Sequence, residues 1–411
     1  MINREPRAKP ILRDCLFSEY DRGGCYLLMK NRASFRFVSA GRVHQSPFML
    51  QANRLISLDA LRGFTIAAMI MVNFPGSEQY VYFTLRHTKW NGLSFTDNIA
   101  PVFLFVIGVS IVFAYAKKKD TVPKGGLYKK IIFRSLKIFA VGVFLNLMPE
   151  FDFANIRWTG TLHRIAIVFL ICAIIFLHTT WKQQAWIATI LLIGYWLVLS
   201  CIPTPGYGQV MFEPGKNIVA WVDSKYLPGK MWQGTWDPES ILTNITSVVT
   251  GLTGMLAGHL MLTNYTPNQK ANYLMTAGIF SAIVGYFWGL IFPVNENLWT
   301  SSFVLVTSGF AALLFGALYF LVDILGYKKW TRPGIIFGSN AITAYVLADV
   351  FALLFYRAKF SGLPLNELVV RKLISTGMQA ELASMLYALF FVCVNFIPAY
   401  ILYRKKIFIK L

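Results

Sequence analysis

The hydrophobic positions of this chain come in long runs that are separated by polar connections. A helix needs roughly 20 consecutive apolar residues to cross a bilayer, and we find ten runs that meet this requirement. We therefore predict an all-α, polytopic helical membrane bundle of about ten transmembrane helices. The predicted spans are 58–74, 98–116, 131–148, 164–180, 185–202, 241–262, 273–292, 299–324, 335–356 and 382–403.

Composition supports a membrane protein and argues against a nucleic-acid partner. The chain is 56% hydrophobic and 14% charged, whereas a typical soluble domain is about 25% charged. Its net charge of +20 would suit a nucleic acid. However, the basic residues lie in connections beside apolar runs, which is the pattern of topology determinants rather than of a surface that follows phosphates.

The positions of these basic residues predict how the chain faces the membrane. The connection 117–130 holds six lysines, and the chain ends in YRKKIFIK. Cytoplasmic connections are enriched in Lys and Arg, so we place both on the inner side, with both termini cytoplasmic. The segment Met71–Gly92 and the long connection 203–240 then lie on the outer face.

The N-terminal residues 1–52 differ from the rest, because they are basic and lack periodicity. They are either a disordered cytoplasmic tail or a stretch that precedes a true start at Met49, and we place the membrane domain at 53–411. Five cysteines show no CxxC spacing. Cys172 and Cys393 lie in apolar runs, so we expect small buried hydrophobic residues there, with neither a disulfide nor a metal site.

His87 is the strongest candidate for catalysis, because it lies among polar groups in an outer connection between two spans. An imidazole has a pKa near about 6.5 and can accept or donate a proton there. Asn73, at the outer end of the first span, could orient that imidazole or donate to a carbonyl oxygen. Asp97 precedes the second span and is either its N-cap or a group of the same site.

Charged residues inside spans are costly, about 2.5–3.5 kcal/mol each at the bilayer centre, and usually serve a function. Asp59 and Arg62 lie three residues apart at the inner end of the first span. They form either a helix-end ion pair or a contact to an anionic ligand. Arg134 and Lys137 repeat this spacing in the third span. With Arg62, they could attract phosphates from the cytoplasm, or they could anchor the inner ends of the helices.

The outer connection 203–240 is too long to be a simple turn, because loops beyond about 15 residues usually have a function or are disordered. Its tryptophans argue against disorder and serve either as interfacial anchors or as a surface for sugar stacking. Its acidic residues Asp223, Asp237 and Glu239 could attract a cationic amino sugar.

Several motifs, in order along the chain, resemble the heparan-α-glucosaminide N-acetyltransferase family of transmembrane acyltransferases. They begin with RLISLDALRGFTIAAMIMVN, the HxxWNG pattern in HTKWNG, and Asp97 followed by FLFVIGVS. WTGTLHRIA and NENLWTSS follow, with His163 in place of the family's Gln and Glu296 in place of its Lys, and PGIIFGSNAITAYV comes last. The resemblance covers roughly 53–405.

The resemblance implies transfer of an acetyl group from cytosolic acetyl-CoA to the amine of a glucosamine-type sugar on the outer face. It implies that His87 is catalytic with Asn73 as its companion. We expect no metal cofactor. The HTKWNG motif places Trp90 and Asn91 beside the acceptor, and the CoA phosphates would meet Arg62, Arg134 and Lys137. We expect a bacterial inner-membrane enzyme, and the animal members imply a homodimer.

The residues leave two questions of mechanism and function open. His87 either removes a proton from the acceptor or becomes acetylated itself. The alternative function is a transporter of N-acetylglucosamine or another amino sugar. A transporter usually carries internal repeats, and the sequence shows no obvious repeat.

Overall fold

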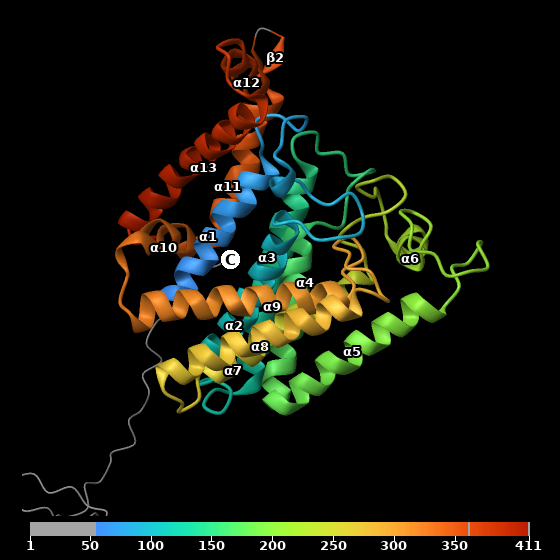
Figure 1. The fold of residues 1–411 in the computed structure, drawn as a ribbon, viewed down its shortest axis with the longest axis vertical. Helices are drawn as coiled ribbons and strands as arrows, with labels where there is room; N and C mark the ends of the chain where they lie inside the picture. Colours follow the sequence, from blue (N-terminus) through green and yellow to red (C-terminus); the bar gives the residue numbers. More distant parts are fainter. Residues whose placement is uncertain (1–54, 361, 410–411) are drawn as a thin grey trace, which may run out of the picture. The chain divides into compact units, whose positions relative to one another are not determined.

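The computed structural model describes residues 55–360 and 362–409, and its regular structure is almost entirely helical (Figure 1). The α-helices are α1 (Ile56–Asn73), α2 (Ile99–Tyr115), α3 (Lys124–Leu147), α4 (Thr161–His178), α5 (Trp181–Cys201), α6 (Ile218–Tyr226), α7 (Thr243–Met261), α8 (Pro267–Trp288), α9 (Ser301–Leu318), α10 (Arg332–Ser339), α11 (Ala341–Ala352), α12 (Leu365–Ser375) and α13 (Ala380–Arg404). The short elements are the 3₁₀-helices η1 (Phe83–Leu85), η2 (Thr96–Asn98) and η4 (Lys329–Thr331), the π-helices η3 (Tyr319–Ile324) and η5 (Leu353–Arg357), and the antiparallel strands β1 (Lys359–Phe360) and β2 (Leu363–Pro364). The predicted tail, 1–52, lies outside the described residues.

The predicted helical membrane bundle is confirmed. Six helices in the described part of the chain are long and apolar enough to cross a membrane, and a bent pair of helices makes a seventh candidate. They occupy seven of the ten predicted spans. Their bounds are Ile56–Asn73, Thr96–Tyr115, Thr161–His178, Trp181–Cys201, Ser301–Ile324, Ala380–Arg404 and the pair Lys329–Ser339 with Ala341–Arg357.

The other three predicted spans are helical, as α3, α7 and α8, but they do not meet that test of length and composition. The first turns of α3 hold three lysines, and α7 carries five Thr and Ser residues. Of the Thr and Ser in α7, all but Thr253 are buried inside the bundle. A helix that is surrounded by other helices need not be apolar, so the count of ten crossings stays a prediction for these three segments.

The predicted span 335–356 is not one straight helix. α10 and α11 meet at Asn340 and are bent by 74°. The side chain of Asn340 fastens this bend to the C-terminal backbone, because its amide donates to Ile407 O at 2.9 Å and accepts from Ile409 N at 2.8 Å. The prediction of a continuous helix is therefore wrong at this point.

Small residues let the helices approach one another closely, as is usual in membrane bundles. α1 packs against α10, where a Cβ added to Gly63 would lie 1.7 Å from the carbonyl oxygen of Gly334. α2 packs against α7, where a Cβ added to Gly254 would lie 2.0 Å from the carbonyl oxygen of Phe105. A larger side chain at either glycine would force the two backbones apart.

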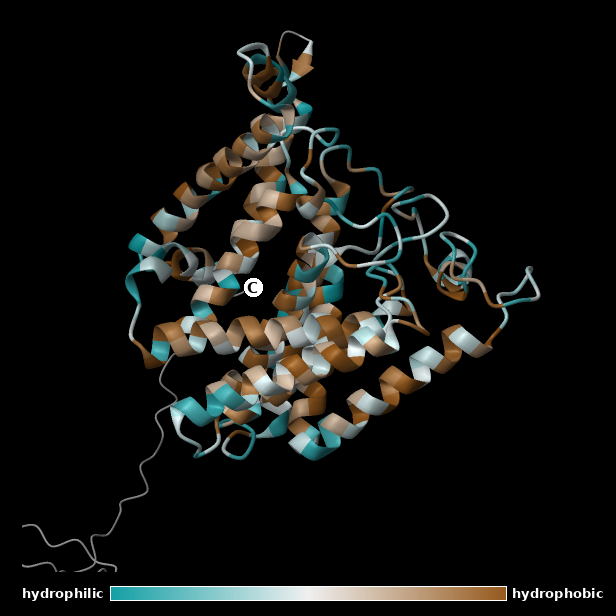
Figure 2. Cartoon of the chain, in the orientation of Figure 1, coloured by the Kyte–Doolittle hydropathy of each residue, from teal (hydrophilic) through white to brown (hydrophobic). Residues whose placement is uncertain are grey.

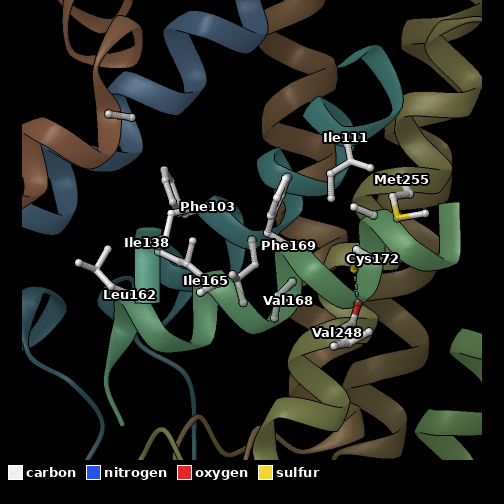
Figure 3. Packing of buried hydrophobic residues seen from close by; sticks show 14 of the residues in the cluster. Phe103, Ile111, Ile138, Leu162, Ile165, Val168, Phe169, Cys172, Val248 and Met255 are labelled. Atoms are coloured by element: carbon white, nitrogen blue, oxygen red, sulfur yellow. Dashed lines mark hydrogen bonds between the residues drawn. The ribbon is translucent and has the colours of Figure 1, made fainter. Parts of the chain in front are cut away.

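The core lies where α2, α3, α4 and α7 meet (Figure 3). Phe103, Ile138 and Phe169 point into it from three different helices. Cys172 is fully buried in the same cluster, and its thiol donates to Val248 O at 3.5 Å, which confirms the small buried hydrophobic residue predicted there. Cys393 is exposed instead, so that prediction is wrong for the second cysteine.

The helices differ in how much of their surface is buried by the rest of the bundle. In α2, 72% of the apolar span is buried by other parts of the chain, compared with 28% in α5 and in α13. Both of these helices carry hydrophobic residues along most of their length (Figure 2). Since apolar residues on the outside of a membrane bundle meet lipid, α5 and α13 form its lipid-facing periphery.

The connections between helices form two groups, which places them on two sides of the bundle. On the side that we call the His87 side, Gly92 N donates to Val294 O, Trp90 Nε1 to Phe212 O, and Gly76 N to Ser384 O. These bonds join the connection α1–α2 to α8–α9, to α5–α7 and to the start of α13. On the opposite side, Lys119 Nζ donates to Phe176 O and Thr179 O, which joins α2–α3 to α4–α5.

Candidate active site

His87 lies in the connection between α1 and α2, and its imidazole contacts two carboxylates. Nδ1 is 2.8 Å from Asp97 Oδ1 and 2.9 Å from Glu296 Oε2. Ionised carboxylates only accept hydrogen bonds, so Nδ1 carries the hydrogen and is shared between the two oxygens. Nε2 is the nitrogen left for a substrate, and 53% of the His87 side chain is exposed.

Asp97 is the fixed member of this cluster. Its side chain is fully buried, and besides His87 it accepts hydrogen bonds from Ser94 N at 2.8 Å, Thr88 Oγ1 at 3.0 Å and Thr88 N at 3.4 Å. The residue that precedes α2 is Asn98, and the donors to Asp97 all lie outside that helix. The N-cap interpretation is therefore wrong, and Asp97 is a partner of the imidazole.

Glu296 is brought to His87 by the short loop between α8 and α9. Asn295 shapes this loop, because its Oδ1 accepts from Leu298 N at 2.8 Å and its backbone N donates to Thr300 Oγ1 at 3.1 Å. Trp299 has a φ of 45°, which is unusual for a residue other than glycine. A turn of this kind is held by its surroundings, and such backbone strain is found mainly at functional sites.

The HTKWNG segment is tied to the neighbouring loops. Asn91 Oδ1 accepts from Asn295 Nδ2 at 3.0 Å. Trp90 donates to Phe212 O at 2.8 Å and packs edge-on against Trp236, with ring centroids 5.1 Å apart. These contacts position His87 against Glu296, and the predicted role of Trp90 and Asn91 in binding the acceptor stays a prediction.

The sequence singled out Glu296 as a departure from the family motif at a place that could shape the acceptor site, and it did not predict the contact with His87. Glu296 and His87 are 209 residues apart in sequence. The available signal was an acidic residue in a short connection on the same predicted side as Met71–Gly92. The other departure, His163, is buried in α4, with its ring edge-on to Phe139 at 4.5 Å.

Burial and the neighbouring carboxylates change the protonation of this cluster. Burial alone would lower the pKa of His87, but hydrogen bonds and charge from Asp97 and Glu296 outweigh it and raise the pKa to about 10. Burial raises the pKa of Glu296 to about 7, against the opposing effect of the His87 imidazolium. At neutral pH, His87 is therefore charged and Glu296 is close to its midpoint.

Asn73 is the last residue of α1, and its side chain is exposed. The backbone beside it is anchored, because Phe74 O accepts from the hydroxyl of Tyr356 at 2.6 Å. Within the described residues, no hydrogen bond joins Asn73 to His87. Its predicted role as the companion of His87 stays a prediction that would need contact through a substrate.

Asp237 and Glu239, predicted to bind the acceptor, hold Arg157 between them. Arg157 binds Asp237 through two hydrogen bonds of 2.8 and 2.7 Å and Glu239 through one of 2.6 Å. Its guanidinium lies over the ring of Trp232, 4.9 Å from the centroid. Asp237 also accepts from Thr159 Oγ1 at 2.8 Å. This cluster fastens the 203–240 connection to the α3–α4 connection, and an additional role in binding stays a prediction.

Asp223 belongs to the same connection but lies on α6, a helix that was not predicted inside 203–240. Its Oδ1 accepts from Ser240 Oγ at 2.9 Å and from Ile241 N at 3.1 Å, whereas Oδ2 is buried without a partner among the described residues. Burial raises the pKa of Asp223 to about 6. The observed bonds fix α6 against the start of α7, and its predicted contact with the acceptor is untested.

The three cations predicted to meet the CoA phosphates lie on α1 and α3. Arg62 donates to Asp59 Oδ1 at 3.2 Å and to Ser110 Oγ at 2.6 Å. The ion pair predicted as one interpretation of Asp59 and Arg62 is thus present. Arg134 lies over the ring of Phe169, and Lys137 lies over Phe133. Their predicted role in phosphate binding is neither supported nor contradicted by these contacts.

The cluster of His87, Asp97 and Glu296 also has the composition of a cation site, since one ligand atom from each lies within 4.8 Å of the others. In the structure, His87 Nδ1 lies within hydrogen-bonding distance of both carboxylates. The chemistry that the arrangement offers directly is proton transfer.

Comparison with known proteins gives one family. A family model described as heparan-alpha-glucosaminide N-acetyltransferase, catalytic, matches residues 54–222, a range that contains His87, Asn73 and Asp97. The human protein named heparan-alpha-glucosaminide N-acetyltransferase is 27% identical over 424 residues, covering 87% of this chain and 60% of the human protein. The mouse protein of the same name is 25% identical over 425 residues, covering 88% of this chain and 61% of its own length.

The chain thus spans about three fifths of the length of the curated relatives that it matches. The resemblance predicted from the sequence motifs is confirmed by these matches. Glu296 lies beyond the residues that the family model covers.

Proposed function

We propose that this chain, an integral membrane relative of the heparan-α-glucosaminide N-acetyltransferase family, transfers an acetyl group from acetyl-CoA to the amine of a glucosamine-type sugar on the outer face of the membrane. The observation that carries the proposal is the half-exposed imidazole of His87, which is held through Nδ1 by two carboxylates. This arrangement leaves one nitrogen for acid–base chemistry on a substrate.

Acetyl transfer to an amine needs groups that move protons. A protonated amine has no lone pair with which to attack a carbonyl carbon, and a departing thiolate needs a proton. The raised pKa of His87 supports direct transfer over an acetyl-histidine route, because a protonated imidazole has no lone pair on Nε2. Asn73 would donate to the thioester carbonyl or orient the acceptor.

The two sides of the bundle suit a donor and an acceptor from different compartments. The connection α2–α3, with its lysines, lies opposite the His87 side. If the positive-inside rule holds, the His87 side faces outward. The acetyl-CoA phosphates would then meet Arg62, Arg134 and Lys137 from the cytoplasm, and Asp223, Asp237 and Glu239 would help to attract a cationic sugar.

The test uses purified protein in sealed proteoliposomes, with labelled acetyl-CoA on the side of the lysine-rich connection and glucosamine on the other. Wild type is compared with His87→Ala and with Glu367→Gln, a control in an exposed ion pair with Arg371 on α12. We expect labelled N-acetylglucosamine from wild type and from the control, and at least about a hundredfold less from His87→Ala.

Two outcomes would overturn the proposal. Acetylation that continues in His87→Ala would remove His87 from the chemistry. Uptake of N-acetylglucosamine that survives the same substitution, without any acetylation by the wild type, would identify a transporter. During turnover of the wild type, protein quenched in acid should carry no labelled acetyl group on His87.

A further inference from the structure

The two carboxylates that share His87 Nδ1 differ in how firmly they are held. Asp97 is fully buried and accepts hydrogen bonds from the backbone and side chain of Thr88, from Ser94 N and from His87. The side chain of Glu296 accepts from His87 and lies within hydrogen-bonding reach of Asp97, and it keeps 17% of its surface exposed. Asp97 is therefore a fixed anion, whereas no backbone donor among the described residues holds Glu296 and part of its side chain is exposed.

We propose that Glu296 is the proton acceptor of this site and makes it selective for cationic primary amines, while His87, oriented by Asp97, gives a proton to the departing thiolate. This inference rests on the proposed acetyl transfer. It goes beyond the resemblance, because the family motif has Lys where this chain has Glu296.

The protons balance over one turnover. The acceptor arrives as an ammonium ion and gives one proton to the Glu296 carboxylate, which leaves a neutral amine. The amine nitrogen attacks the thioester carbonyl carbon, the carbon–nitrogen bond forms and the carbon–sulfur bond breaks. His87 donates its Nε2 proton to the leaving thiolate and takes the second proton from the nitrogen. The products are the amide and the free thiol, and protonated Glu296 later releases its proton to water.

The groups around Glu296 suit this role. His87 and Asp97 face it from the α1–α2 connection, and the carboxyls of Asp97 and Glu296 lie within hydrogen-bonding reach of each other. Arg164 from α4 stacks on Trp299 at 4.2 Å and interacts electrostatically with Glu296. Tyr195 from α5 donates to Leu298 O in the same loop at 2.7 Å. A protonated Glu296 can therefore donate to Asp97 while it stores the proton.

The ionisation of Glu296 supports the same role. Burial raises its pKa to about 7, so near neutral pH the carboxylate can both take up a proton and release it. The pKa of Glu296 lies below that of His87. Near neutral pH, His87 therefore stays protonated while Glu296 gains and loses its proton. A general base works best when its pKa lies near the working pH.

The test compares wild type, Glu296→Gln, Glu296→Asp and the control Glu367→Gln over a range of pH. The measured quantity is kcat/KM for glucosamine at saturating acetyl-CoA. We expect Glu296→Gln to lose about a hundredfold at neutral pH. The deficit should shrink as pH rises, because free amine then forms in solution without help. Glu296→Asp should restore part of the rate. It should also restore the rise of kcat/KM with pH near neutral pH.

A second acceptor separates chemistry from misfolding. An aminooxy analogue of glucosamine has a nitrogen that is neutral at neutral pH and does not need a proton acceptor. Glu296→Gln should acetylate this analogue at a rate within a fewfold of wild type. An equal loss with both acceptors, at every pH, would show that Glu296 is only structural and would overturn the inference.

The outcomes also separate this inference from the proposed function. If wild type acetylates glucosamine and Glu296→Gln keeps both the rate and the pH profile, the inference about Glu296 fails and the acetyltransferase stands. If wild type acetylates neither acceptor, the proposed function itself fails. If added Zn²⁺ changes the wild-type rate and leaves Glu296→Gln unaffected, the cluster binds a metal and the proton role is wrong.

Discussion

Two clusters in this protein each place one cationic side chain between two carboxylates. In one, Arg157 is held by Asp237 and Glu239, and in the other, His87 is held by Asp97 and Glu296. The arginine keeps only 18% of its side chain exposed, whereas the histidine keeps 53%. The composition of the clusters is alike, but the cations differ in whether they can lose a proton.

This difference separates a structural cluster from a reactive one. A guanidinium remains protonated in proteins and presents several donors in a fixed geometry, so Arg157 is suited to fastening two connections together. An imidazole offers a second nitrogen and exchanges protons near neutral pH. The role of acidic residues near a site therefore depends on the side chain that they contact. Their number alone does not indicate whether they are structural or reactive.

The largest predicted effect is on the stability of the Arg157 cluster. Replacing Asp237 by Asn leaves Arg157 with one carboxylate, and breaking a buried ion pair in this way typically costs about 3–5 kcal/mol. The measurement is the free energy of unfolding in detergent, by denaturant. Lys216→Gln, which breaks the exposed pair between Lys216 and Glu213, is the matched control and should leave the midpoint unchanged. An Asp237→Asn protein as stable as wild type would contradict the structural role.

The second prediction concerns opposite responses to pH. The pKa of Asp237 is held below its ordinary value by Arg157, against the effect of burial. The stability that ionised Asp237 provides is present above the pKa of Asp237 in the unfolded chain, and it is lost as pH falls. The pKa of His87 is raised to about 10, so its contribution is present below about 6.5 and is lost as pH rises towards 10.

Nuclear magnetic resonance of histidine labelled with ¹³C should therefore show His87 as imidazolium at pH 8. Glu296→Gln should lower the midpoint of its titration, because one of the two carboxylates becomes neutral. His87→Ala supplies the assignment of the signal. A His87 signal that titrates near 6.5, with or without Glu296, would contradict the electrostatics of the site.

The smallest predicted effect is that of Trp90→Phe. This change keeps the ring against Trp236 and removes the hydrogen bond to Phe212 O. A typical hydrogen bond of this kind contributes about 1 kcal/mol. We expect a loss of stability of that size and a change in acetyl transfer of less than tenfold. A much greater loss of transfer, in a protein that remains folded, would support the predicted contact between Trp90 and the acceptor.

The sequence predicted the helices well and singled out His87 as a candidate, because both depend on local features. Long apolar runs predicted the spans, and His87 stood out among polar residues between two of them. The contact between Glu296 and His87 could not be predicted, because it joins residues 209 apart. The bend at Asn340 depends on a contact with the C-terminal backbone, which no local pattern contains.

The start of α6 has a local signal in the sequence. α6 begins after Asn217, whose side chain accepts from Ala220 N, and Asn is a favoured residue at a helix start. The role of Asp97 was ambiguous for the opposite reason. Asp suits both a helix N-cap and a partner for an imidazole, and only the positions of Thr88, Ser94 and His87 decide between them.

One measurement tests the central difference between the two clusters most directly. The rate of acetyl transfer to glucosamine is measured for His87→Ala and for Arg157→Gln, each divided by the folded fraction of that preparation. We predict that His87→Ala loses at least about a hundredfold in rate per folded molecule. Arg157→Gln should be less stable yet keep a rate within a fewfold of wild type per folded molecule. A folded Arg157→Gln without activity, together with an active His87→Ala, would contradict the account.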